Sequence, residues 1–329
     1  MDDMNRRSFI SLGLLGALTL PARRGRLLAR PLPPLLREGD TVALIAPGSP
    51  VAPERLDMAI DNLRGLGLRV REGRSLRRVQ GYLAGADAER AADLHAAFAD
   101  PEVRGVWCAR GGYGCTRLLD ILDYALIRRN PKVFVGFSDV TALHAVLTER
   151  CGMATFHTQV AATPWVEPVR ERLRATLFEG GPASYTLRAD GAFQTANPLQ
   201  ETRGVLVGGN LALMAALCGG PYAPSYRNKI VFIEDVGERP YRIDRMLTQL
   251  LQGSDLPKAA AIALGRFSEC EPRAGENSLS LAECLADRLG SLGVPVVGHF
   301  PFGHIAENFP IPCGQKACLQ GSDLHLFAI

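Results

Sequence analysis

The stretch that decides the fold is residues 132–147, with the sequence KVFVGFSDVTALHAVL. Its first part, Lys132–Val135, is a short apolar run that predicts a buried strand, and Asp139–Leu147 predicts a helix. Only a few residues, Ser138 among them, separate the two. A strand that passes directly into a helix is the repeating unit of an α/β domain.

The same alternation continues on the N-terminal side of this stretch. The expected strands are Thr41–Ala46, Leu68–Val70 and Val103–Cys108, and the expected helices are Glu54–Leu66, Asp87–Phe98 and Tyr113–Leu122. Regular alternation favours a parallel sheet over an α+β arrangement, because parallel strands need a crossover connection. We therefore expect an α/β fold whose N-terminal domain, residues 36–165, is a flavodoxin-like parallel sheet with helices on both faces.

The pattern weakens over residues 166–200, where prolines and glycines interrupt it on either side of a helix at Arg170–Leu177. We expect the interdomain connection there, followed by a second α/β domain at residues 201–329. Its expected strands are Val205–Val207, Ile230–Ile233, Ala260–Leu264, Val294–Val297, Ala317–Leu319 and Leu324–Phe327, and its helices are Leu211–Cys218, a helix from Pro240 and Leu279–Leu289.

The first residues, 1–35, are expected to be an export signal and not part of the fold. Arg6 and Arg7 precede an apolar run at residues 9–20, which is the twin-arginine pattern. Twelve apolar residues are too few to span a bilayer of about 30 Å as a helix. The pattern predicts a periplasmic or exported protein, tethered to the membrane if the signal stays uncleaved; the alternative is a short buried helix.

Charge and cysteine content exclude several classes of protein. The net charge of the 329 residues is +3, but residues 1–30 alone carry +4, so the remaining chain has a net charge of −1. A body without basic charge gives no electrostatic case for nucleic-acid binding. The eight cysteines form no Cys-x-x-Cys pair, which disfavours zinc ribbons and dithiol redox sites. Several lie in apolar runs and are expected to be buried thiols, although the sequence leaves their pairing open.

Ser138 is a candidate nucleophile because it lies in the turn between the strand and the helix. Such a turn exposes the hydroxyl above the sheet edge, and the helix N-terminus that follows favours a developing oxyanion. The alternative is that Ser138 only caps the helix. A serine nucleophile needs a base and an orienting acid. Spacing alone leaves two choices open for each: His299 or His304, and Glu234 or Asp235.

Taken together, six segments resemble the LD-carboxypeptidase family over roughly residues 38–329. The segments are IAP at 45–47, WCARGGYGC at 107–115, GFSDVT at 136–141, GGNL at 208–211, FIEDVGERPYR at 232–242, and FGH at 302–304 with PCG at 312–314. Carried over by position, the resemblance implies that Ser138 is the nucleophile, His304 the base and Glu234 the orienting acid. It also implies an oxyanion hole formed by the backbone amides of Gly112 and Asp139.

The resemblance implies a serine carboxypeptidase that releases a terminal D-alanine from murein tetrapeptides through an acyl-enzyme, with no metal or organic cofactor. Nucleophile and base would then lie on different domains. Arg110 and Arg242 are candidates for holding the substrate carboxylate, since guanidinium matches carboxylate in bidentate fashion; structural ion pairs are the alternative. The rival functions are cleavage of peptide–nucleotide antibiotics and a non-catalytic exported two-lobe binding protein. A homodimer is implied by the resemblance alone.

Overall fold

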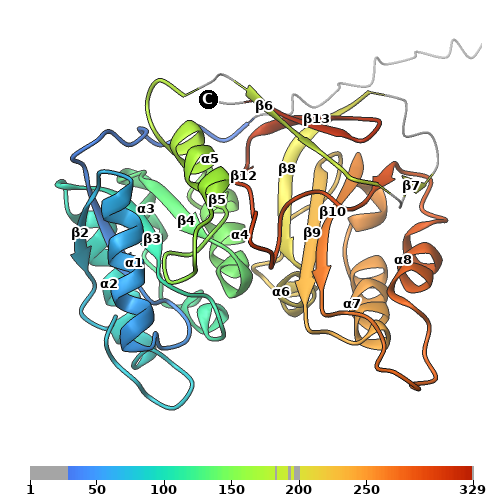
Figure 1. Cartoon of the computed structure of the whole chain (residues 1–329), viewed down its shortest axis with the longest axis horizontal. Helices are drawn as coiled ribbons and strands as arrows, with labels where there is room; N and C mark the ends of the chain where they lie inside the picture. The colour runs from blue at the N-terminus through green and yellow to red at the C-terminus, as the bar shows by residue number, and fades with distance from the viewer. Residues whose placement is uncertain (1–28, 182–183, 192–193, 196–200, 328–329) are drawn as a thin grey trace, which may run out of the picture.

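The computed structural model describes residues 29–181, 184–191, 194–195 and 201–327, and the twin-arginine segment lies outside them except for its last residues. Two α/β bodies lie side by side, the first coloured blue to green and the second yellow to red in Figure 1. No helix in the described part is long and apolar enough to cross a membrane.

The first sheet has six strands in the order β12-β5-β4-β3-β1-β2. The strands are β1 (Thr41–Ile45), β2 (Arg69–Glu72), β3 (Val103–Cys108), β4 (Val133–Gly136), β5 (Thr155–His157) and β12 (Ile311–Cys313). Strands β2-β1-β3-β4-β5 are parallel, and this 2-1-3-4-5 order is that of flavodoxin-like folds. Strand β12 comes from the far end of the chain and adds to β5 in the antiparallel sense.

Helices cover both faces of this sheet, as the sequence predicts. Successive strand residues point to opposite faces, so Val133 and Val135 join one apolar cluster and Phe134 joins the other. One face is covered by α1 (Pro53–Gly65) and α5 (Glu167–Leu177), and the other by α2 (Asp87–Ala99), α3 (Tyr124–Arg129) and α4 (Thr141–Glu149).

The helix expected at Tyr113–Leu122 is wrong. Only a single 3₁₀ turn, η1 (Cys115–Leu118), forms there, and α3 begins later, behind its cap Asp123. The cause lies in Gly112 and Gly114, whose φ angles of 84° and 122° are not helical. These residues instead form a loop at the carboxyl end of β3.

The second sheet has eight strands in the order β6-β14-β13-β8-β9-β10-β11-β7. The strands are β6 (Ser184–Arg188), β7 (Gln194–Thr195), β8 (Thr202–Asn210), β9 (Ile230–Val236), β10 (Ala261–Ser268), β11 (Val296–Val297), β13 (Lys316–Gln320) and β14 (Asp323–Phe327). Its centre, β8-β9-β10-β11, is parallel, and the outer strands are antiparallel. Helices α6 (Leu211–Leu217), α7 (Pro240–Gly253) and α8 (Leu281–Leu289) pack in the cluster on one face.

Two segments tie the bodies together. The 166–200 stretch supplies α5 to the first body and β6 and β7 to the second sheet. In return, β12 of the last segment enters the first sheet beside β5 (Figure 1). The crossing into β12 passes the carboxyl end of β5, because Ile311 pairs with His157, and Ser138 follows the neighbouring strand β4. All eight cysteines are free thiols, and seven of them are buried.

Candidate active site

Ser138 lies in the turn after β4, at the start of a 3₁₀ turn, η2 (Ser138–Val140), that leads into α4. Its φ is 64°, in the left-handed region that non-glycine residues rarely adopt. The preceding turn is tight, because a Cβ on Gly136 would stand 2.8 Å from a methyl of Val140. Strain of this kind is stored at functional sites, where the surrounding structure enforces it.

Asp139 fastens the loop from β3 to this turn. Its carboxylate is buried and accepts a hydrogen bond from the Cys115 amide at 2.7 Å. Burial raises the pKa of Asp139, and the Cys115 amide opposes that rise. A fully buried arginine, Arg90, donates to the carbonyls of Pro47 and Gly114 and so holds the same loop from its other side.

Gly111 and Gly112 lie directly against the nucleophile turn. A Cβ on Gly111 would stand 3.0 Å from the Ser138 Cβ and 3.1 Å from the Asp139 amide nitrogen. Neither the Gly112 amide nor the Asp139 amide donates a hydrogen bond to another described residue. Two free amides beside a hydroxyl have the composition of an oxyanion hole.

Glu234 lies within β9, which continues two residues beyond it to Val236, so it does not end the strand as the sequence suggested. Its side chain is fully buried, and Oε2 lies 2.7 Å from Nδ1 of His304. Burial acts to raise the pKa of Glu234, but interactions with His157 and His304 outweigh it and lower that pKa to about 2. Glu234 is therefore an anion at neutral pH.

Asp235, the neighbour of Glu234, is hydrogen-bonded to the start of α6. Its oxygens accept from the Asn210 side chain at 2.9 Å and from the Ala212 amide at 3.0 Å, which fixes the start of α6. Burial raises its pKa to about 6. Of the two acids that local spacing left open, Glu234 is the one hydrogen-bonded to an imidazole, that of His304.

His304 lies in the loop between β11 and β12, with its side chain 20% exposed. Gly303 has a φ of 118°, and a Cβ there would stand 3.0 Å from the Cβ of Glu234, so the glycine permits the close approach. The ring of His304 packs on Phe137, the residue before Ser138, with 4.7 Å between ring centroids. Nδ1 of the other candidate base, His299, lies 3.6 Å from Oδ1 of Asp190 instead.

Residues of the first body hold the His304 loop. Thr158 Oγ1 donates to the Asn308 carbonyl at 3.0 Å. Gln159 Nε2 donates to the carbonyls of Ile305 and Ala306, both at 3.1 Å. The imidazole of His304 therefore lies at the junction of the two bodies, beside the turn that carries Ser138. Within the described residues no hydrogen bond joins Ser138 to His304, and catalytic hydrogen bonds often tighten only when substrate binds.

The two arginines differ in their surroundings. Arg110 donates to the Pro50 carbonyl and lines a cavity of about 320 Å³ beside the Gly111–Gly112 loop. The same cavity is lined by Arg55 and Glu54 from the start of α1. Nη1 of Arg242, on α7, lies 3.5 Å from Oε2 of Glu238 in an i,i+4 ion pair.

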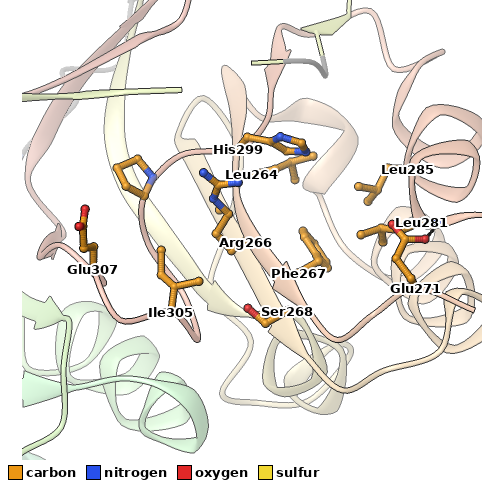
Figure 2. A pocket seen from close by; sticks show the side chains of 12 residues that line it. Leu264, Arg266, Phe267, Ser268, Glu271, Leu281, Leu285, His299, Ile305 and Glu307 are labelled. Atoms are coloured by element: carbon orange, nitrogen blue, oxygen red, sulfur yellow. Dashed lines mark hydrogen bonds between the residues drawn. The ribbon is translucent and has the colours of Figure 1, made fainter. Parts of the chain in front are cut away.

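A larger cavity, of about 550 Å³, lies beside the loop that carries His304, because Ile305 and Glu307 line it (Figure 2). Ile305 and Ser268 line one side, and Leu281 and Leu285 of α8 line the other. Ser268 Oγ also donates to the carbonyl of His304 at 2.8 Å.

His157 is the residue near the site that the sequence analysis did not select. It ends β5, is fully buried, and its Nε2 lies 3.8 Å from Oε1 of Glu234. A signal was present in the sequence: His157 follows an apolar segment next along the chain from the helix after Ser138, as expected for neighbouring strand ends. Because three residues are a short strand, the segment 155–157 was not recognised as one.

The fold and this junction site define a class, the two-domain α/β hydrolases. A family model described as the LD-carboxypeptidase N-terminal domain matches residues 42–158. A second, described as the LD-carboxypeptidase C-terminal domain, matches residues 203–319. The chain belongs to the LD-carboxypeptidase family.

Named relatives support a peptidase of murein peptides. The chain is 41% identical over 300 residues to the probable murein peptide carboxypeptidase of Bacillus subtilis, covering 88% of this chain and 92% of that one. It is 36% identical over 299 residues to the murein tetrapeptide carboxypeptidase of Pseudomonas aeruginosa, covering 86% and 94%.

Solved structures agree on the fold. A muramoyltetrapeptide carboxypeptidase from Oxalobacter formigenes superposes with a TM-score of 0.76 at 31% identity, covering 87% of this chain and 97% of that one. The microcin C7 self-immunity protein MccF superposes with a TM-score of 0.81 at 23% identity, covering 91% and 99%. At that identity the second likeness is one of fold alone.

Proposed function

We propose that this chain is a serine carboxypeptidase that hydrolyses the amide between an L-centre and the terminal D-alanine of murein tetrapeptides. The observation that carries the proposal is the buried Glu234–His304 hydrogen bond of 2.7 Å, with that imidazole packed beside the strained turn of Ser138. The names of the relatives from Bacillus subtilis and Pseudomonas aeruginosa supply the substrate class.

In this proposal the Ser138 hydroxyl attacks the carbonyl carbon while Nε2 of His304 takes its proton. Glu234 accepts from Nδ1, which fixes the tautomer and stabilises the imidazolium. The amides of Gly112 and Asp139 bind the oxyanion, and removing one such donor costs about 3 kcal/mol of barrier. His304 then protonates the departing amine of D-alanine, and water, deprotonated by the same imidazole, releases the acyl group from Ser138.

We further propose that Arg110 and Arg55 hold the carboxylate of the departing residue. Both line the 320 Å³ cavity beside the amide loop, and each uses one side-chain hydrogen bond to a backbone carbonyl. Glu54 lowers the net charge of the lining to +1, which still favours an anion. Arg242 is paired with Glu238 on an exposed face, so we assign it no contact with the substrate.

Digestion of purified murein tetrapeptides tests the proposal. The wild-type chain should release D-alanine, and Ser138→Ala should release none while remaining folded. If the wild-type chain leaves tetrapeptides intact but cleaves an aminoacyl nucleotide, the antibiotic-cleaving alternative takes its place. If it binds peptide and cleaves neither, it is a binding protein.

A matched pair of substrates tests the arginines. Tetrapeptides that end in a carboxylate or in an amide should differ in kcat/KM for the wild-type chain, and Arg110→Gln or Arg55→Gln should erase most of that difference. Arg242→Gln is the control and should preserve it. An undiminished preference in both arginine variants would remove them from the carboxylate site.

Export and assembly are proposals from the sequence. We propose that residues 1–35 direct twin-arginine export, which would place the enzyme on murein outside the cytoplasm. Replacing Arg6 and Arg7 by lysine should retain the protein in the cytoplasm on cell fractionation. The homodimer implied by the family is checked by light scattering of the purified chain.

A further inference from the structure

Two buried polar groups beside the proposed triad lack hydrogen-bond partners. Both ring nitrogens of His157 and Oε1 of Glu234 are unpaired within the described residues. The side chains of both residues are 0% exposed. A buried polar group without a partner costs free energy and calls for a reason in the structure. His157 Nε2 and Glu234 Oε1 face each other at 3.8 Å, about 1 Å beyond a normal hydrogen bond.

Aromatic rings fix the plane of His157. Phe232 contacts it edge-on at 5.2 Å between centroids, and Phe137 does so at 6.0 Å. The same Phe137 packs on His304 and precedes Ser138. The ring of His157 is therefore coupled by packing to the nucleophile turn and to the base, while its Nε2 faces the acid.

Four titratable groups face His157 from the surrounding elements. His144, on α4, has both ring nitrogens hydrogen-bonded, and burial lowers its pKa to about 3, so it is neutral. Burial raises the pKa of Cys313, on β12, to about 12, so the thiol is neutral too. Glu234 and His304 complete the set. Among the residues that the structure describes, the anion that His157 faces is thus Glu234.

We propose that His157 is a positioning residue for the triad: its Nε2–H donates to Oε1 of Glu234, so that the carboxylate is held between two imidazoles. This inference rests on the proposed function, and it assigns His157 no contact with substrate. A movement of about 1 Å by either buried side chain would bring Nε2–H within hydrogen-bond distance of Oε1, and it needs no substrate. The second hydrogen bond favours the ionised carboxylate and orients Oε2 toward His304.

The sign of the effect follows from proton linkage. The active form of the Glu234–His304 pair is one proton poorer than the inactive form, and a donor on Oε1 stabilises the form with the full negative charge. Removing that donor therefore makes the pair bind its proton more tightly. The apparent pKa of His304 should rise by about one unit, the size expected for one hydrogen bond to a charged group.

The test compares His157→Phe with His157→Gln. Phenylalanine keeps an aromatic side chain without a donor among Phe137 and Phe232, and glutamine carries an amide N–H near the former position of Nε2. NMR of the imidazole rings gives the pKa of His304 without any substrate. The phenylalanine variant should raise it by about one unit and lower kcat by up to about tenfold at neutral pH, with KM little changed. The glutamine variant should return both toward wild type.

His144→Gln is the control, because it disturbs the buried histidine next to His157 and leaves Glu234 untouched. It should lower the unfolding temperature and leave the pKa of His304 in place. If His157→Phe folds and His304 titrates as in wild type, His157 is structural and the proposal is overturned. Because the titration needs no turnover, a chain that cleaves no tetrapeptide would refute the proposed function and still decide the role of His157.

Discussion

The left-handed backbone of Ser138 makes a prediction about stability. A non-glycine residue at a φ of 64° costs on the order of 1 kcal/mol, which glycine does not pay. Ser138→Gly should therefore be more stable than Ser138→Ala by about 1 kcal/mol in urea denaturation, with both variants inactive. Equal stabilities would mean that the turn is relaxed and not enforced by the loop packed against it.

The buried His144 predicts how stability depends on pH. Burial lowers its folded pKa to about 3, below the value of about 6.5 in the unfolded chain, so its stabilising contribution is complete above pH 6.5 and is lost as the pH falls. By pH 4.5 the loss should be about 3 kcal/mol. The difference in unfolding free energy between wild type and His144→Gln should shrink over that window; a constant difference would contradict it.

At the residue scale, local spacing could propose chemistry but could not choose the base and the acid; the family resemblance made that choice. The sequence identifies Ser138 as a candidate because it lies between an expected strand and an expected helix. Local spacing could not decide between Glu234 and Asp235 as the acid, because they are adjacent. It could not decide between His299 and His304 as the base, because they lie in the same region and share the same local pattern. The choice of acid depends on the face of β9 from which each side chain points, and the choice of base depends on the φ of Gly303. A local sequence pattern determines neither.

At the element scale, the loop after β3 is the part of the site most sensitive to an added side chain. A Cβ on Gly112 would stand 2.4 Å from Ser49 Oγ, and the φ of 84° disfavours any side chain. Gly112→Ala should lower kcat about 100-fold by displacing the amide. Gly152→Ala is the control, since Gly152 has a φ of 70° and open space around it. It should lose stability of about 1 kcal/mol and keep its activity.

The loop that carries His304 is held to the first body by Gln159 as well as by Thr158. Gln159 donates to the carbonyls of Ile305 and Ala306 across the junction. Gln159→Leu should lower kcat about tenfold, because a small displacement of a catalytic group is costly, while the unfolding temperature changes little. Steady-state kinetics beside calorimetry checks this. Unchanged kcat would mean that the loop is held without Gln159.

Most regular elements were predictable because their hydrophobic periods are clear, as in β3, α2 and α7. The helix expected at Tyr113–Leu122 failed because the positive φ angles of Gly112 and Gly114 are not helical, so that only a 3₁₀ turn forms there. Strands β5 and β12 were missed because each has three residues and is stabilised by its neighbours in the sheet.

At the scale of the whole molecule, the chain builds its site by crossing between bodies. Strand β12 leaves the second body to join β5, and the loop before it places His304 against Phe137, the residue before Ser138. A sequence pattern assigns each element to its own region, so it predicted two α/β domains and did not predict this exchange. The exchange brings the imidazole of His304, which is hydrogen-bonded to Glu234, beside the turn that carries Ser138.

Labelling with a serine-reactive fluorophosphonate tests this convergence most directly. Mass spectrometry of the wild-type chain should find one adduct, on Ser138. His304→Ala should slow its formation at least 100-fold, and Glu234→Gln should slow it by a smaller factor. A folded wild-type chain that gains no adduct, or a His304→Ala variant that labels as fast as wild type, would contradict the account.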